Sequence, residues 1–156
     1  MTGSMFLNND KLNTWLQELS TQATVYVPVQ AGEAVDFQPY SPEAEINLLE
    51  QPTAPPKKVV FPQTETLLKY RYEKDPDHPD TQKVRVKETL PHEKSIVFGC
   101  RPCGAKGFVI FDPVYESNQV TDPYYKARRE QTLFISLACR EQDSSCFCHW
   151  VGGSPV

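Results

Sequence analysis

SIVFGCRPCGAKGFVIFDPVY, residues 95–115, is the stretch that decides how this chain folds. It opens with a short apolar run, Ser95 to Phe98, which predicts a strand. A loop from Gly99 to Gly104 follows, and its glycines permit backbone conformations that other residues resist. The apolar residues from 105 to 111, and on to 115, then predict a helix. The stretch therefore reads as strand, loop and helix in succession.

The next ordered segment, TDPYYKARREQTLFISLAC at residues 121–139, predicts a helix followed by a strand. Asp122 can cap the helix and Pro123 suits its first position. The strand is expected from Thr132 to Cys139. The order strand, helix, helix, strand favours an α/β or α+β fold, with a small mixed sheet flanked by short helices. Fourteen prolines indicate that the fold is rich in loops.

The first 94 residues carry weaker signals. Apolar residues at helical spacing predict a helix over residues 10–19, and β-branched residues predict a strand over 24–29. The proline-rich run QPTAPPKK at 51–58 ends an acidic segment that we interpret as a surface connection. We further expect a strand edge at 59–61 and a short helix at 64–70. Residues 72–93 are rich in charge and predict a solvated turn, after which Val84, Val86 and Leu90 predict a return to strand.

Composition limits the class of protein. A chain of 156 residues suits a single domain, residues 1–156, with an irregular cysteine-rich segment at 139–156. The net charge of -4 disfavours a nucleic-acid surface, which needs a clustered basic face. No stretch approaches the ~18–20 apolar residues that span a bilayer, and the start lacks a signal-peptide pattern. We therefore expect a cytoplasmic protein without a membrane span.

The cysteines carry the strongest functional signal. In a reducing compartment, five cysteines indicate metal ligation or redox chemistry more than disulfides. Cys103 and Cys139 follow predicted strands, and Cys146 and Cys148 lie in a polar tail, so the four can converge. Four thiolates suit a 4Fe-4S cluster or a structural zinc ion, for which His149 is a substitute ligand. The alternative is that they are small buried side chains, above all Cys100.

Two strings add a family resemblance. VFGCRPCGAKGFVIFDPVY and DPYYKARREQTLFISLACREQDSSCFCHWVGGSP resemble the amino-terminal region of iron-sulfur subunits of the sulfhydrogenase beta and anaerobic sulfite reductase A type. That family has a similar FG-x-RPC loop, a DPYY-x-x-RR helix start, a strand ending in cysteine and a CFC followed by glycines. The similarity covers about residues 55–156. In the family a ferredoxin-like module with two further clusters follows, and this sequence ends before it.

The resemblance implies an electron-transfer subunit of a multi-subunit, anaerobic oxidoreductase such as a hydrogenase or sulfite reductase. A 4Fe-4S cluster would be held by the matching cysteines, which are Cys103, Cys139, Cys146 and Cys148. The chain would have no catalytic residue of its own. Its partners would be other subunits of the complex, including a flavin-containing one. Cys100 and Gly104 depart from the family pattern, which leaves the surroundings of the cluster open.

Several other residues are candidates for binding roles. Arg101, Arg128 and Arg129 can pair with the charge of a cluster, a cofactor phosphate or a partner's carboxylates. For Arg128 and Arg129, ion pairs on the helix surface are an equal alternative. Tyr124 and Tyr125 suit core packing better than a flavin site. Phe147 and Trp150 are expected to cover the cluster.

Two other functions remain open from the sequence. In one, the metal is zinc or is absent, and the domain is a docking module for a catalytic partner. In the other, Cys146 and Cys148 form a thiol redox centre, which needs nearby positive charge to lower the thiol pKa.

Overall fold

The fold is described from a computed structural model, which covers residues 6–78, 80–142 and 144–155. Its main sheet has four strands in the order β2-β1-β5-β6. β1 pairs antiparallel with β2, whereas β1 with β5 and β5 with β6 are parallel. The bounds of these strands are β1 Thr24–Ala31, β2 Ala34–Pro39, β5 Ser95–Cys100 and β6 Thr132–Ser136.

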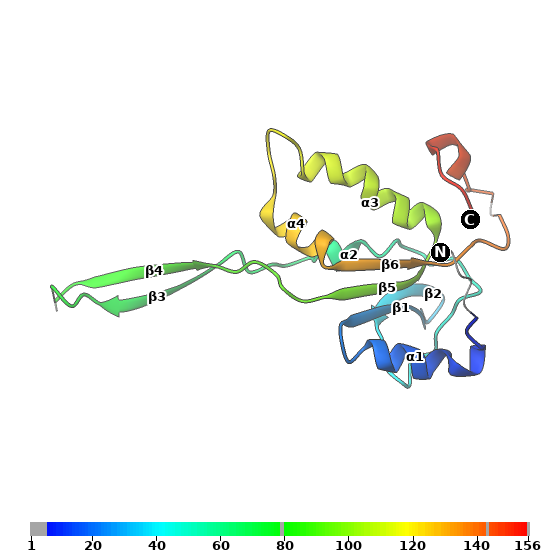
Figure 1. The fold of residues 1–156 in the computed structure, drawn as a ribbon, viewed down its shortest axis with the longest axis horizontal. Helices are drawn as coiled ribbons and strands as arrows, with labels where there is room; N and C mark the ends of the chain where they lie inside the picture. The colour runs from blue at the N-terminus through cyan, green and yellow to red at the C-terminus, as the bar shows by residue number, and fades with distance from the viewer. Residues whose placement is uncertain (1–5, 79, 143, 156) are drawn as a thin grey trace.

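Helix α1 (Leu12–Leu19), which follows a 3-10 turn η1 (Asn9–Lys11), covers one face of this sheet (Figure 1). Successive residues of a strand point to opposite faces, so Val25, Val27 and Val29 all point toward α1. They form a buried cluster with Leu16, which is fully buried, and with Ile96. The helix predicted at residues 10–19 and the strand predicted at 24–29 are thus both present.

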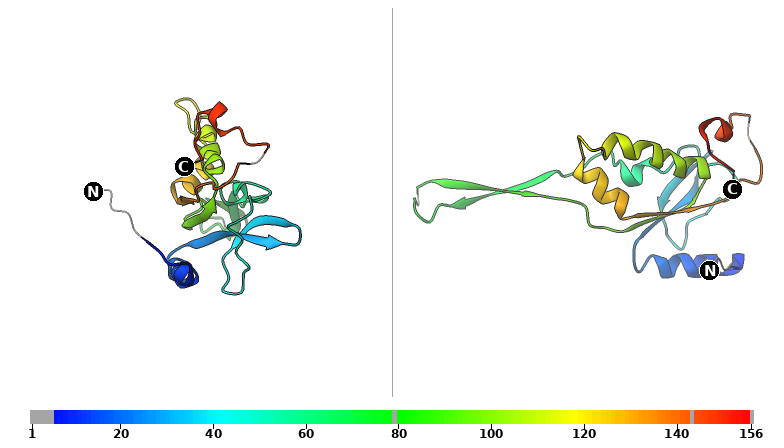
Figure 2. Two further views of the ribbon diagram at one scale, coloured as in Figure 1. Left: turned by 90° about the vertical axis from the view of Figure 1, so that its right-hand side faces the viewer. Right: turned by 45° about the horizontal axis from the view of Figure 1, so that its top comes forward.

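The other face of the sheet is covered by α2 (Lys57–Val60), α3 (Pro102–Tyr115) and α4 (Pro123–Glu130) (Figures 1 and 2). Two buried clusters lie there. Their buried members are Phe37, Val59, Val97 and Cys100 in the first, and Val60, Phe108 and Tyr125 in the second. The mixed sheet with short helices on both faces confirms the α/β class expected from the sequence.

A second sheet projects from the body as a two-stranded arm. β3 (Leu68–Lys74) and β4 (Gln82–Glu88) pair antiparallel and extend far beyond the main sheet (Figures 1 and 2). The helix predicted at 64–70 is wrong, because charged and apolar residues alternate with a period of two from Lys69 onward. Val84 and Val86 do lie in a strand, as predicted, whereas Leu90 lies beyond its end.

Two expectations for the first half of the chain need correction. Residues 34–39 form β2 and not a connection, since Val35 and Phe37 alternate with polar residues and are buried. The sharp turn between β1 and β2 uses Gly32, whose φ is 65°. Residues 57–60 form the short helix α2 where a strand edge was predicted at 59–61. Both segments are ordered by packing against distant residues.

The boundaries of the last elements also differ from the prediction. α3 begins at Pro102, so Cys103 lies in its first turn and not in a loop. β6 ends at Ser136, which leaves Cys139 three residues beyond the strand. The cap of α4 is confirmed, because the Asp122 side chain accepts hydrogen bonds from the amides of Tyr124 and Tyr125 at 2.9 and 3.0 Å. No helix in the described ranges is long and apolar enough to cross a membrane.

Candidate metal centre

The first cysteine of the predicted set is positioned by the end of β5. A bulge between Phe98 and Cys100 turns the chain, with Gly99 at a φ of 81°. A Cβ atom at Gly99 would lie only 3.1 Å from Leu48 Cδ2 and 3.2 Å from the Pro28 ring. Both the positive φ and the lack of space therefore favour glycine at this position. The chain then enters α3 through Arg101, and Cys103 is exposed in the first helical turn.

The other three cysteines reach the same end of the molecule through the segments after β6. The amide of Leu137 donates to the Cys100 carbonyl at 2.9 Å, which keeps this segment beside the end of β5. The amide of Cys139 donates to the Pro155 carbonyl at 2.9 Å, so the tail folds back over it. Within the tail, Gly153 donates to the Cys148 carbonyl at 2.8 Å, next to the 3-10 turn η2 (Cys148–Val151).

The pKa of the Cys139 thiol responds to burial and to the charged groups around it. The pKa of Cys139 is raised, first by burial, and further by the charges of Cys103, Cys148 and Cys146. The guanidinium of Arg101 acts in the opposite direction and favours the Cys139 thiolate. The segments that carry the four cysteines thus meet near one end of the main sheet, and Arg101 lies there as well.

The described side chains near the cysteines are not arranged as a complete metal site. Among the residues with described positions, no group of three or more His, Cys, Asp or Glu side chains is arranged to hold a metal ion. Cys103 is exposed, and the other three cysteines are half-buried. By chemistry the donor set suits a cubane cluster, because four cysteines lie on three segments that meet near one end of the sheet.

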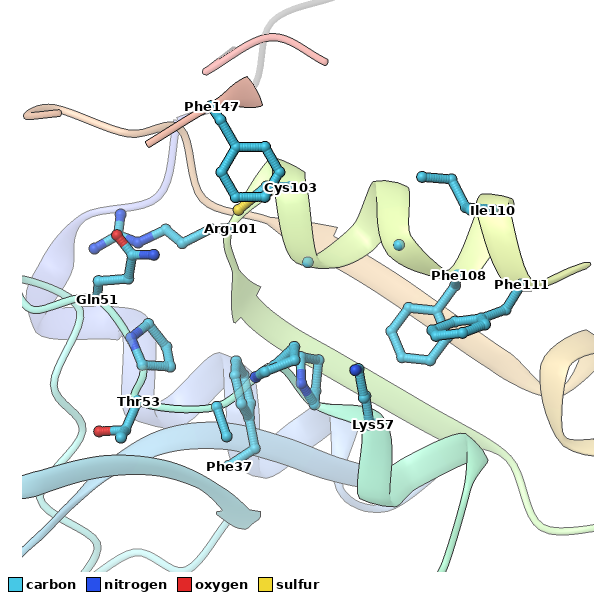
Figure 3. A pocket seen from close by; sticks show the side chains of 16 residues that line it. Phe37, Gln51, Thr53, Lys57, Arg101, Cys103, Phe108, Ile110, Phe111 and Phe147 are labelled. Carbon is cyan, nitrogen blue, oxygen red and sulfur yellow. The ribbon is translucent and has the colours of Figure 1, made fainter. Parts of the chain in front are cut away.

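A pocket of about 430 Å³ opens beside Cys103 (Figure 3). It lies between α3 and the proline-rich segment 51–57, and aromatic rings form much of its wall. Phe147, between two of the cysteines, borders the pocket at the same end as Cys103 and Arg101, while Lys57 lies at the α2 side. Sequence reasoning missed this pocket, since its walls come from segments about fifty residues apart that no local pattern connects.

Arg101 also stabilises a loop from another part of the chain. Its Nη2 donates to the carbonyls of Leu48, Leu49 and Glu50 at 3.3, 3.2 and 3.2 Å, which holds that loop against the start of α3. A charged donor shared among carbonyls stays a full positive charge, so Arg101 can hold the loop and act on the thiols at once.

Arg128 and Arg129 are not brought to the cysteines. Both lie on α4, which packs near the opposite end of α3 (Figure 1). Arg128 pairs with Glu65, and Arg129 pairs with Asp112 through two hydrogen bonds of 3.0 and 3.2 Å. Both arginines are thus held in ion pairs, and the carboxylates belong to other segments and not to neighbours on the same helix.

The aromatic candidates divide in the same way. Tyr125 is buried, and its hydroxyl donates a hydrogen bond to Asp112 at 2.6 Å. Burial is the main cause that raises the pKa of Tyr125, and this hydrogen bond raises it further. Tyr125 is thus a packing residue, as expected. Phe147 and Trp150 are 62% and 81% exposed. Both lie in the tail, outside the three buried clusters.

Cys100 and His149 are the two remaining candidates near the four cysteines. Cys100 is fully buried, burial raises its thiol pKa, and its sulfur lies 3.6 Å from the Ser136 hydroxyl. It is a core side chain. His149 lies in η2 with its ring 5.3 Å from the Trp150 ring.

Comparison with family models, with curated proteins and with solved structures finds no match to this chain.

Proposed function

We propose that this chain is an iron-sulfur electron-transfer domain in which Cys103, Cys139, Cys146 and Cys148 hold one 4Fe-4S cluster. The observation that carries the proposal is the convergence of three separate segments, each bearing thiols, at one end of the main sheet. The sequence motifs select the same four cysteines independently. An excess of thiols in one place has few other uses in a reducing compartment.

The surrounding residues suit the charge of such a group. Cys103 lies in the first turn of a 14-residue helix, where the positive end of the helix dipole favours a negatively charged group such as a cluster. Arg101 adds a positive charge beside Cys139. When bound, the cluster would supply one-electron transfer, and its potential would respond to these charges and to solvent exposure.

The wider setting follows from the resemblance. We place the domain in a cytoplasmic, multi-subunit oxidoreductase of the hydrogenase or sulfite reductase kind, where it would pass electrons between other subunits, one of them containing flavin. Catalysis would belong to those partners. The exposed position of Cys103 favours this role, because electron transfer needs a short path from the cluster to a partner.

Anaerobic reconstitution with iron and sulfide tests the ligand assignment. We expect about four iron and four sulfide ions per chain, with broad visible absorption that bleaches on reduction. Replacing both Cys146→Ser and Cys148→Ser should abolish the signal. Cys100→Ser is the matched control, since this buried thiol lies outside the ligand set and should leave the stoichiometry unchanged. A double variant that still binds one full cluster would refute the assignment.

Zinc is the competing occupant of the same thiols. Elemental analysis of protein purified with and without air separates the two, because a cluster degrades in oxygen whereas a zinc ion stays. Stoichiometric zinc in both preparations, with no iron uptake on reconstitution, would replace the electron-transfer proposal by that of a zinc-stabilised docking module.

A further inference from the structure

The arm formed by β3 and β4 has one apolar face. Residues that oppose each other across an antiparallel pair share a face, and Tyr70 opposes Val86 while Tyr72 opposes Val84. With Leu68 they form an apolar row on one side of the arm. Each of these five side chains is more than half exposed. Nothing in the described part of the chain covers this face.

The opposite face is cationic. Lys69 opposes Lys87 and Arg71 opposes Arg85, which places like charges directly across from each other. Glu73 pairs with both arginines, and Asp75 pairs with Lys83 at 2.9 Å. Lys69 and Lys87 form no ion pair within the described residues. Two positive charges thus face each other without a compensating carboxylate.

The arm concentrates charge of the opposite sign to the rest of the chain. Its two strands contain six lysine and arginine residues and two glutamates, a net charge of +4. The turn between them adds three aspartates, so residues 68–88 together carry +1 and the rest of the chain carries -5. The positive charge of the arm therefore gathers on its strands, above all on one face of β4, which suits an acidic partner.

The two outer edges of the arm also carry backbone N–H and C=O groups without a neighbouring strand in the described structure. The sheet has only two strands in the described structure, so each strand has a free outer edge. An isolated two-stranded hairpin is only marginally stable in water, and a third strand is the usual remedy. Free edges of this kind recruit extended segments of other chains.

We propose that the outer edge of β4 binds an extended segment of a partner protein in which acidic and apolar residues alternate. Added to the sheet, such a strand would place its apolar side chains beside Val84 and Val86 and its carboxylates beside Lys83, Arg85 and Lys87. The inference is independent of the cysteines.

β4 suits this partner better than β3 does. Every residue that β4 places on the cationic face is basic, whereas β3 places Glu73 there beside Lys69 and Arg71. A second copy of β4 is a poor occupant, because antiparallel pairing about Arg85 would set Lys83 against Lys87 and Arg85 against itself. Nucleic acid is disfavoured because the rings and the cations lie on opposite faces.

A defined peptide tests the proposal. The probe is an end-capped heptapeptide of alternating glutamate and valine, titrated into the full chain and followed by NMR and calorimetry. We expect saturable binding with amide shifts centred on residues 83–87. A peptide with lysine in place of glutamate should bind at least ~10-fold more weakly. N-methylation of the peptide backbone should abolish binding, because strand addition needs those amides.

Two matched variants locate the edge. Lys87→Glu and Lys69→Glu both remove the repulsion between Lys69 and Lys87, so both should keep or improve the stability of the arm. Only Lys87→Glu changes the strand that binds, and it should weaken the peptide about tenfold, while Lys69→Glu stays within about twofold. Peptide binding that is absent, unaffected by N-methylation or equally weakened by both variants would overturn the proposal.

Two other occupants would also overturn it. One is a single-stranded oligonucleotide that binds the arm more tightly than the acidic peptide. The other is a dimer of the chain, detected by sedimentation, that Lys87→Glu dissociates.

Discussion

Gly99 lies at the bulge near the end of β5, shortly before α3, and its replacement by alanine should destabilise the fold measurably. The residue has a φ of 81°, and an added Cβ would meet Leu48 and Pro28 at 3.1 and 3.2 Å. Gly32 offers a matched comparison, since its φ is 65° but nothing lies within 4 Å of an added Cβ. The two sites share the backbone cost and differ in the packing cost.

The magnitudes follow from these two terms. A non-glycine residue in the left-handed region costs ~1–2 kcal/mol, and the stiffer unfolded chain returns ~0.4–1 kcal/mol. Gly32→Ala should therefore lower the free energy of unfolding by about 1 kcal/mol. Gly99→Ala adds the cost of overpacking a filled site, ~1–3 kcal/mol, so about 2–4 kcal/mol in total is expected. For a chain of this length that lowers the Tm by roughly 4–16 °C.

Urea unfolding followed by circular dichroism measures both variants under identical conditions, and equal m-values would license a direct comparison of the free energies. The reasoning requires Gly99→Ala to be clearly less stable than Gly32→Ala. Equal losses would show that the Leu48 and Pro28 side chains move aside without cost, and that the close approach does not constrain the loop before Cys103.

Three further predictions concern stability. Asp122→Ala removes the cap of α4 and should cost about 1 kcal/mol in urea unfolding; no loss would mean that the two capping hydrogen bonds contribute nothing net. Tyr125→Phe keeps the ring packing but removes the hydrogen bond to Asp112, so a loss of ~1–1.5 kcal/mol is expected, and a neutral result would contradict that bond. Burial raises the pKa of Cys100, so the folded state holds this proton to higher pH than the unfolded chain, and the free energy of unfolding should fall as the pH rises past ~8.5. The fall should be smaller in Cys100→Ala, measured between about pH 7 and 9.5; an identical slope in both proteins would refute it.

Some features of the candidate site are visible in the sequence, whereas others arise only from contacts between distant segments. The four cysteines were selected by residue type, by compartment and by their place after strands, all of which can be read along the chain. The hydrogen bond from the Cys139 amide to the Pro155 carbonyl, and those from Arg101 to the loop at Leu48, join segments that only the folded chain brings together. The same holds for Arg128 and Arg129, whose carboxylate partners lie 63 and 17 residues away.

By itself the sequence determined the elements whose causes lie within a few residues. Helical spacing specified α1, the Asp122-Pro123 pair specified the start of α4, and apolar runs specified β1 and β5. Tertiary structure alone decided the remainder. β2 exists because Val35 and Phe37 find buried partners, and the arm exists because two charged, alternating segments pair with each other and with nothing else described. Strand pairing and the convergence of side chains depend on contacts between residues that are far apart in the sequence. No short window along the chain contains both partners of such a contact.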